Sequence, residues 1–373
     1  MNRPLNIVHT ESSCGWGGQE IRVLTEAQGL IERGHTLTLI CPAEASIHAA
    51  AADYGVPVQA LPIRKKRLPD LLALRRWLAG PGRATDVINS HSSTDSWLAA
   101  LACATLNDAP PIVRTRHVSS PINTGRPTFW LYQSAASHVV VTGEKLKEQL
   151  VRVNGFAADS LTSVPTGIDT ERFLPRAKAV ARNALGLRQE AIYVGILATL
   201  RDWKGHAVLF DALDRLKERY PLLRLLVVGD GPYRDRLDSR LAALGLVDRV
   251  DFVGHRLDAE QWLNAMDVFA LPSWGDEGVS QALMQAMASA LPIVTTPVGS
   301  LTEVIAHEVT GLLVPPRDAV ALAAAIARLL DQPELAGRLG QAARLLAEQR
   351  CGRAIMLERM EGIFQRFARP QRG

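Results

Sequence analysis

The sequence is poor in cysteine and has no long hydrophobic run, and each shortage excludes a class of protein. Four cysteines are spread over 373 residues, with no C-x-x-C pair and no histidines nearby at metal-ligand spacing. They predict neither a disulfide scaffold nor a zinc site, and they fit a reducing compartment. The longest apolar runs fall well short of the roughly 18–20 residues that span a bilayer, so we expect a soluble protein.

A secretory signal is also missing, and the excess of positive charge is small. The apolar run at residues 5–8 is too short for a signal peptide, and we expect it to form a first strand. A net charge of +4 is mild for a nucleic-acid-binding protein but compatible with phosphorylated ligands or an anionic membrane surface. We therefore expect a cytoplasmic protein without a nucleic-acid partner.

Short β-branched runs alternate with helical patterns along nearly the whole chain, as in βαβ units with parallel sheets. The first series predicts strands at 6–9, 37–41, 87–89, 112–116 and 138–142, with helices at 19–33, 68–78, 96–106 and 144–153. The second series predicts strands at 192–197, 223–228, 250–253, 268–271, 292–296 and 311–314. Two doubly wound α/β domains explain this order.

The domain boundary is expected just after the turn-rich segment 164–167, where a polar stretch at 176–190 precedes the second strand series. We assign residues 1–168 to an N-terminal domain and residues 169–352 to a C-terminal domain. A helical pair over 319–349 closes the second sheet, and we expect a last helix at about 353–369 to pack back on the first domain.

A glycine-rich segment follows the first strand and opens the first helix. There, Gly17 and Gly18 allow a ligand to approach the backbone N–H groups at the positive helix end. The segment matches neither G-x-G-x-x-G nor a phosphate-binding loop. With Glu20 in the first helical turn, it can also be no more than a capped tight turn.

Two cations lie in the turn after the first strand of the second series. Arg201 and Lys204 fall at the carboxyl edge where open α/β sheets bind ligands. Such a pair can stabilise the negative charge that develops on a pyrophosphate leaving group. The alternative is two solvated surface cations.

A second ligand-binding candidate links the strand at 268–271 to the next helix. Glu277 is expected at the helix entrance beside the amides of Gly278 and Val279, where it can accept hydrogen bonds from sugar hydroxyls. It can instead serve as N-terminal helix charge, worth roughly 0.3–1 kcal/mol. Gln285 follows eight residues later, which predicts nearly the same helix face.

These segments resemble glycosyltransferase family 4. The resemblance lies in P-T-G-I-D at 165–169, K-G at 204–205, V-G-D-G-P at 228–232, V-G at 253–254, E-G at 277–278 and L-P-I-V at 291–294. G-G-Q-E at 17–20 resembles the N-terminal glycine loop of the family, so the match covers nearly the whole chain. The resemblance implies a retaining nucleotide-sugar enzyme with two Rossmann-like domains facing across a cleft, the GT-B fold.

The resemblance further implies that the C-terminal domain holds the donor. Arg201 and Lys204 would clamp the diphosphate, and Glu277 with the two following amides would hold the transferred sugar. The chain departs from the family pattern at two positions. Thr199 stands where the family usually has its phosphate-binding arginine, and Gln285 replaces the second glutamate of E-x7-E, the usual ribose partner.

In the N-terminal half, His117 resembles the family histidine that faces the donor sugar, although a histidine at a strand end is usually a packed residue. His91 and Asp95 follow another strand end and are candidate acceptor-side residues. Asp95 can alternatively cap the following helix. Arg256, in the turn after a later strand, is a candidate contact for the nucleotide base.

No Asp-x-Asp pattern occurs, so the metal site of the other large glycosyltransferase class is missing, and we expect no cofactor and no metal. The basic run Arg64, Lys65, Lys66 and Arg67 leads into an amphipathic helix. This segment either binds the inner face of the cytoplasmic membrane or forms an ordinary solvated helix end.

The function that follows is transfer of a sugar from a nucleotide-diphosphate sugar to a hydroxyl of a glycan or glycolipid. For this family the acceptor is expected in the cell envelope, such as lipopolysaccharide. Two alternatives are a nucleotide-sugar 2-epimerase of the same architecture and a non-catalytic sugar-nucleotide-binding subunit. The base, the sugar, the acceptor and the oligomeric state stay open.

Overall fold

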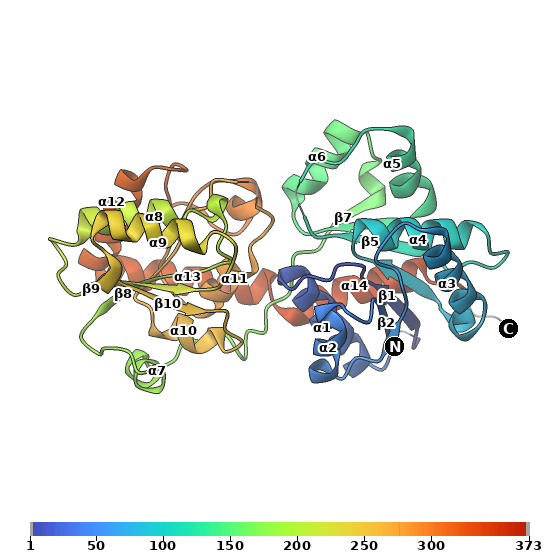
Figure 1. The fold of residues 1–373 in the computed structure, drawn as a ribbon, viewed down its shortest axis with the longest axis horizontal. Coiled ribbons are helices and arrows are strands. Elements are labelled where there is room, and N and C mark those ends of the chain that lie inside the picture. The colour runs from blue at the N-terminus through green and yellow to red at the C-terminus, as the bar shows by residue number, and fades with distance from the viewer. Residues whose placement is uncertain (1–2, 119, 276, 371–373) are drawn as a thin grey trace. The chain divides into compact units, whose positions relative to one another are not determined.

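A computed structural model describes residues 3–118, 120–275 and 277–370, which form two compact α/β units (Figure 1). The N-terminal unit contains Met1–Gly167 and Arg353–Gly373, and the C-terminal unit contains Ile168–Gly352. The four cysteines carry free thiols.

The N-terminal unit is built on a seven-stranded parallel sheet with the strand order β3-β2-β1-β4-β5-β6-β7. Its strands are β1 (Asn6–Thr10), β2 (Thr36–Cys41), β3 (Val58–Ala60), β4 (Val87–Ser90), β5 (Ile112–Arg116), β6 (His138–Val141) and β7 (Leu161–Ser163). Its helices are α1 (Gly18–Glu32), α2 (Ser46–Ala50), α3 (Leu68–Ala79), α4 (Ser93–Ala104), α5 (Arg126–Trp130), α6 (Glu144–Asn154) and α14 (Arg353–Phe367).

Alternation along these strands divides the core between the two faces of the sheet. Ile7 and Val113 pack on the face that carries α1, α2 and α14. Their neighbours Val8 and Ile112 pack on the opposite face, under α3, α4 and α6. Both faces are covered because successive side chains of a strand point in opposite directions, as a doubly wound sheet requires.

The last helix, α14, belongs to the N-terminal unit and packs against α1. Gly29 of α1 allows the close approach, since a Cβ atom at this position would lie 2.3 Å from Leu357 Cδ1. Phe364 is fully buried in the same core, and Arg33 forms an ion pair with Glu361 at 2.9 Å. The end of the chain thus completes the first core.

The C-terminal unit has a six-stranded parallel sheet with the strand order β10-β9-β8-β11-β12-β13. Its strands are β8 (Ile192–Leu197), β9 (Leu223–Val228), β10 (Val250–Gly254), β11 (Val268–Leu271), β12 (Ile293–Thr295) and β13 (Leu312–Leu313). Its helices are α7 (Lys178–Leu185), α8 (His206–Leu216), α9 (Arg234–Leu244), α10 (Ala259–Ala265), α11 (Gln281–Ala288), α12 (Ala319–Asp331) and α13 (Pro333–Arg350). Two Rossmann-like sheets confirm the predicted fold class.

The polar stretch before the second strand series includes a helix that the sequence did not predict. It contains α7, and its Arg182 is 5% exposed and bonds Asp267 at 2.6 Å and the carbonyl of Ala265 at 3.0 Å. A buried arginine satisfied by distant partners leaves no hydrophobic signal in the sequence. The strands β3 and β7 were also missed because each has only three residues and lies at an edge of the sheet.

In both sheets the strand order reverses beside the first strand. The reversal lies between β1 and β4 in one unit and between β8 and β11 in the other. Open α/β sheets bind ligands outside the carboxyl ends of the strands at such a switch point. The loops after these four strands are therefore the places to look for a site.

Candidate active site

Two predicted site residues meet at the switch point of the C-terminal unit. Lys204, in the loop after β8, donates a hydrogen bond from Nζ to Glu277 Oε1 at 2.7 Å, and Glu277 lies in the loop after β11. The Ser273 hydroxyl donates to the same carboxylate oxygen at 2.7 Å. The side chains of Lys204 and Glu277 are 16% and 6% exposed, so this is a largely desolvated ion pair.

Glycines fix the backbone on both sides of this pair. Gly205 adopts φ +81°, and a Cβ atom there would lie 2.1 Å from the carbonyl oxygen of Pro272. Gly299 adopts φ +51°, and a Cβ atom there would lie 2.0 Å from the carbonyl oxygen of Glu277. Because any side chain would force these loops apart, the Lys204–Glu277 contact depends on both glycines.

Glu277 precedes helix α11 and is not part of it, which corrects the predicted shared helix face with Gln285. The helix starts at Gln281, after Ser280 caps it by accepting a hydrogen bond from the amide of Leu283 at 3.4 Å. Gln285 is half-buried on the helix. Gly278 is half-buried and Val279 is buried directly after Glu277, in the loop that leads to the cap.

The other predicted cations of this unit do not join the Lys204–Glu277 pair. Arg201 is exposed and lines a separate cavity of about 410 Å³ together with Asp202, Trp203, Pro232, Tyr233 and Arg236. Arg256 forms an ion pair with Asp258 at 3.1 Å and lies over the ring of Trp262. Thr199 is exposed. The structure therefore brings together one of the two expected diphosphate-binding cations and Glu277.

At the switch point of the N-terminal unit, Asp95 is a helix cap. Ser92 and Asp95 form a capping box at the start of α4. Asp95 also accepts hydrogen bonds from the Thr10 hydroxyl at 2.7 Å, the Ser12 hydroxyl at 3.1 Å and the amide of His91 at 3.0 Å. It is fully buried, so the helix-cap interpretation describes its position better than the acceptor-side one. Gly17 and Gly18 begin helix α1 nearby without a side-chain cap.

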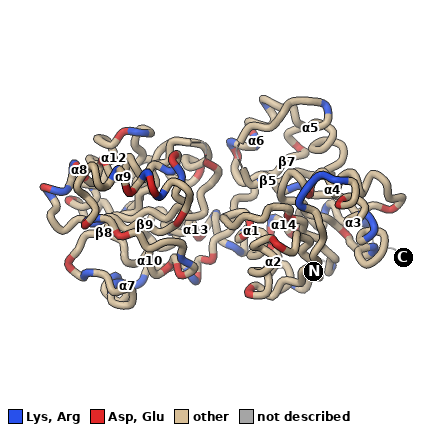
Figure 2. Tube along the Cα trace, in the orientation of Figure 1, with Lys and Arg blue, Asp and Glu red and all other residues tan. Residues whose placement is uncertain are grey.

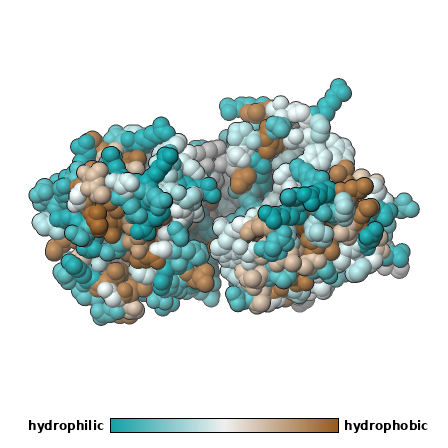
Figure 3. Space-filling model, viewed as in Figure 1, coloured by the Kyte–Doolittle hydropathy of each residue, from teal (hydrophilic) through white to brown (hydrophobic). Residues whose placement is uncertain are grey.

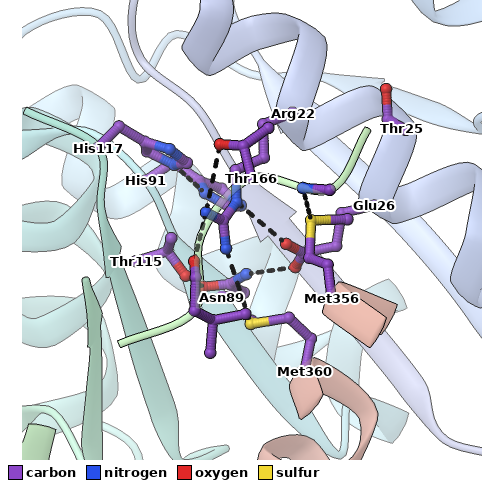
Figure 4. Close-up of polar contacts among 12 residues, drawn as sticks. Arg22, Thr25, Glu26, Asn89, His91, Thr115, His117, Thr166, Met356 and Met360 are labelled. Carbon is purple, nitrogen blue, oxygen red and sulfur yellow. Dashed lines mark hydrogen bonds and ion pairs between the residues drawn. The ribbon is translucent and has the colours of Figure 1, made fainter. Parts of the chain in front are cut away.

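His91 and His117 are in direct contact (Figure 4). His91 Nδ1 lies 2.9 Å from His117 Nε2, and His91 Nε2 lies 3.3 Å from Nδ1 of His9. His9 Nε2 in turn lies 3.7 Å from Glu26 Oε1. The four side chains form a continuous chain that starts from a buried carboxyl and ends at the half-buried His117.

Burial keeps these rings neutral, and the nearby charge of Arg22 adds to the effect. Arg22 lies 3.6 Å from Glu26 and donates to the carbonyl of Val164 at 2.7 Å (Figure 4). Burial, helped by the charge of Arg22, lowers the pKa of His9 to about 3. The pKa values of His91 and His117 are also lowered, mainly by burial.

These lowered pKa values make the N-terminal unit sensitive to acid. The unfolded chain protonates its histidines near pH 6.5, whereas the folded chain does so only at lower pH. The unfolded state therefore binds more protons in the interval between those values. The three rings contribute stability that is present above about pH 6.5 and is lost as the pH falls below it.

We expect all three rings to carry their proton on Nε2. The Glu26 carboxylate favours a proton on His9 Nε2, so that His9 Nδ1 accepts from His91, and His91 Nδ1 accepts from His117. His117 Nδ1 is then a lone-pair nitrogen. Nitrogen-15 chemical shifts of labelled protein at pH 7 should show this neutral form for His117. A proton on His117 Nδ1, or a charged ring, would contradict the assignment.

Several buried ionisable residues of this unit escaped the sequence analysis. Glu11, after β1, bonds the Ser92 hydroxyl and accepts from Gln19 at 2.5 Å, and burial raises its pKa to about 8. His9, Arg22 and Glu26 match no motif, and His9 comes beside His91 through its pairing with Asn89 across β1 and β4. No group of three or more potential metal-ligating side chains occurs within the described part of the chain.

Comparison with known proteins matches both units to sugar-transferring enzymes. Residues 16–172 match the family described as Glycosyltransferase Family 4, and residues 188–332 match that described as Glycosyl transferases group 1. A D-inositol 3-phosphate glycosyltransferase from Stackebrandtia nassauensis is 30% identical over 370 residues, which cover 88% of this chain and 83% of that protein. A lipopolysaccharide core biosynthesis mannosyltransferase, LpsB from Rhizobium meliloti, is 35% identical over 185 residues, 47% of this chain and 52% of its own.

The fold has close counterparts among solved structures. The crystal structure of Anabaena Alr3699/HepE in complex with UDP and glucose superposes with a TM-score of 0.85 at 22% identity, covering 96% of this chain and 99% of that one. Both family matches are to transferases, which argues against the epimerase and the non-catalytic alternatives.

Proposed function

The chain belongs to glycosyltransferase family 4 and is a nucleotide-sugar-dependent glycosyltransferase with the GT-B fold, and from this premise we propose its finer chemistry. It transfers a hexose with retention of anomeric configuration and without a metal ion, to a hydroxyl of a cell-envelope glycan such as lipopolysaccharide, on the cytoplasmic side. The ion pair of Lys204 and Glu277 at the switch point carries this proposal.

In the proposed reaction, the bond between the anomeric carbon and the β-phosphate oxygen breaks. The acceptor oxygen then bonds to that carbon, its proton passes to the released phosphate oxygen, and the nucleoside diphosphate leaves. Lys204 and Arg201 stabilise the charge that develops on the diphosphate. Glu277, with the Gly278 and Val279 amides, binds the hydroxyls of the sugar. His117 is proposed as a sugar-contacting residue with a neutral ring, and Gly17 and Gly18 let a substrate approach the start of α1.

In the structure the Lys204 ammonium is bonded to the Glu277 carboxylate. A donor therefore has to share or replace this bond. The contact holds both side chains at the switch point before the donor arrives, so less side-chain freedom is lost on binding. This preorganisation supports a donor site that works without the usual arginine at position 199.

The proposed class of acceptor rests on family membership and on two relatives that act on different molecules. One acts on D-inositol 3-phosphate and the other in lipopolysaccharide core synthesis, by their names. The direct test of the function is release of nucleoside diphosphate from UDP-, GDP-, ADP- and TDP-sugars with envelope-glycan acceptors, each with and without EDTA. Release that EDTA abolishes and a divalent cation restores would contradict the metal-free mechanism.

Gln285 is expected to bind the donor ribose less tightly than the glutamate that the family usually has at this position. A carboxylate forms charge-assisted hydrogen bonds of about 1.5–3 kcal/mol, against about 0.5–1.5 kcal/mol for neutral ones. The Gln285→Glu variant should thus bind donor roughly fivefold more tightly in a calorimetric titration. Gln261→Glu makes the same charge change at an exposed position of α10 and should leave affinity unaltered. Unchanged or weaker binding by Gln285→Glu would refute the ribose role.

The basic run and α3 are proposed to bind an anionic membrane surface. Arg64, Lys65, Lys66 and Arg67 are all exposed in the loop before α3, where Figure 2 shows a continuous basic stretch. Leu68, at the start of the helix, is 67% exposed. Apolar residues otherwise lie in several separate areas of the visible face (Figure 3). None of the described helices combines the length and apolarity needed to cross a bilayer.

Neutralising these four cations should release the protein from anionic liposomes, since each contributes roughly 1 kcal/mol near such a surface. Pelleting with vesicles of acidic phospholipid measures this. A variant that neutralises Arg215, Lys217 and Arg219 on and just after α8 serves as the charge control and should pellet like the unaltered protein. Undiminished pelleting of the four-residue variant would refute the membrane role.

A further inference from the structure

Two arginines on β5 are buried without an ion pair to any carboxylate that the structure describes. Arg114 and Arg116 are two residues apart, so both project from the same face of the sheet, and they are 4% and 7% exposed. Nε and Nη1 of Arg114 and Nε of Arg116 have no hydrogen-bond partner among the described residues. A buried cation that lacks partners is costly, and native proteins rarely keep one without a use for it.

The contacts that these arginines do make are neutral. The Arg114 guanidinium lies 4.3 Å from the centre of the Tyr132 ring. Arg116 Nη1 lies 3.4 Å from the Tyr132 hydroxyl, and Nη2 donates to the carbonyl of Ser120. Burial lowers the pKa of Arg116, and the neighbouring charge of Arg114 contributes to the shift. Two like charges therefore share one desolvated site.

The same chain pairs its other buried arginines with acids. Arg22 lies 3.6 Å from Glu26, and Arg182 lies 2.6 Å from Asp267. Arg114 and Arg116 form no such ion pair with any described carboxylate. Asp95, whose charge interacts with Arg114, is already bonded by the Thr10 and Ser12 hydroxyls and the amides of residues 91 and 92. No carboxylate among the described residues is thus left to form an ion pair with these two arginines, which leaves room for an external anion.

The position of the two arginines and the chemistry of their guanidinium groups indicate which kind of anion they bind. Arg116 ends β5, at the carboxyl edge of the sheet where such folds bind ligands, and it directly precedes His117. Planar guanidinium groups with free N–H donors match the oxygen atoms of phosphate and carboxylate. We propose that Arg114 and Arg116 bind an oxyanion, a phosphate or a carboxylate, carried by the acceptor. That the acceptor carries this anion rests on the proposed function, whereas the anion site itself does not.

The test uses the full chain without donor, so that binding is measured independently of transfer. Thermal unfolding is followed while inorganic phosphate or malonate replaces chloride at constant ionic strength. We expect one of the two to raise Tm by about 3 °C at roughly ten times its dissociation constant, which tells phosphate from carboxylate recognition. Arg114→Met should lose this response, because the free guanidinium donors are gone.

Stability without the anion separates a binding arginine from a structural one. In chloride alone, Arg114→Met should unfold at the same temperature as the unaltered protein or higher, since it removes an uncompensated buried charge. The matched control, Arg182→Met, removes an equally buried but paired arginine and should lower Tm. Arg75→Met removes an exposed arginine that is bonded to Thr105 and should keep the anion response.

The outcomes are distinct. Loss of the anion response in Arg114→Met, with Tm in chloride maintained, supports the site. The site would be overturned if Arg114→Met responded to the anion as the unaltered protein does, or if the unaltered protein showed no response. It would also be overturned if the Tm of Arg114→Met in chloride fell as far as that of Arg182→Met. Buried water would then be the partner of these donors. If the anion response depends on Arg114 but no sugar is transferred to any acceptor, the anion site stands and the proposed function fails.

Discussion

Replacing Lys204 with methionine is expected to lower sugar transfer by about 10²–10³-fold, the usual effect of removing one group that stabilises developing negative charge. Its ammonium is held 2.7 Å from Glu277 Oε1 at the switch point. The same change leaves the buried Glu277 carboxylate with the Ser273 hydroxyl but no cation. We therefore expect a stability loss of about 3–5 kcal/mol in chemical denaturation.

A second variant separates the two effects of this substitution. Lys204→Met combined with Glu277→Gln removes both charges, so most of the lost stability should return while transfer stays low. Initial rates of nucleoside diphosphate release, measured on protein that is folded by circular dichroism, provide the comparison. Near-normal rates in either folded variant would show that Lys204 does not act on the leaving group.

Removing the His117 imidazole is expected to lower kcat by about 10²-fold and to leave nucleotide binding unchanged. Nucleotide binding is proposed for the C-terminal unit, whereas His117 follows β5 of the N-terminal unit. His117→Ala should fold, because the ring is half-buried at the end of a strand. Steady-state kinetics and nucleoside diphosphate titrations measure the two quantities separately.

The matched control for His117 is another ring in the same chain of contacts. His9→Phe keeps an aromatic ring next to Phe364 but breaks the contact with Glu26. It should reduce kcat less than His117→Ala and shift its pH dependence, because the tautomer of His117 is no longer fixed. If His117→Ala retains full kcat, His117 has no role in transfer. It is then a packed residue at a strand end, which was the alternative prediction from the sequence.

Strands and long helices could be predicted from the sequence because hydrophobic periodicity is a local signal. The bounds of β5, β8, β9, β11 and α14 agree with the predicted ranges. The strands β8, β9 and β11 read as nearly continuous apolar runs, and α14 is amphipathic. The helix α7 was missed because its stability comes from Arg182 and Asp267, which are 85 residues apart in the sequence.

The candidate site could be predicted in part for the same reason. Lys204 and Glu277 were identified from their places after strand ends and from family motifs, and the structure brings their side chains into contact. The contact of His91 with His9 depends on the register that pairs His9 with Asn89, which no local pattern encodes. The unpaired state of Arg114 is likewise a property of the packed fold, since a sequence does not show which charges lack partners.

Ligand-dependent thermal unfolding tests most directly whether the Lys204–Glu277 site binds a nucleotide-diphosphate sugar without a metal. The full chain is heated with UDP-, GDP-, ADP- and TDP-sugars, each with and without EDTA. A ligand at 100 times its dissociation constant stabilises the fold by about 2.7 kcal/mol. We predict that one nucleotide class raises Tm equally with and without EDTA, and that Lys204→Met loses this shift. No shift with any donor, or a shift that EDTA removes, would contradict the account.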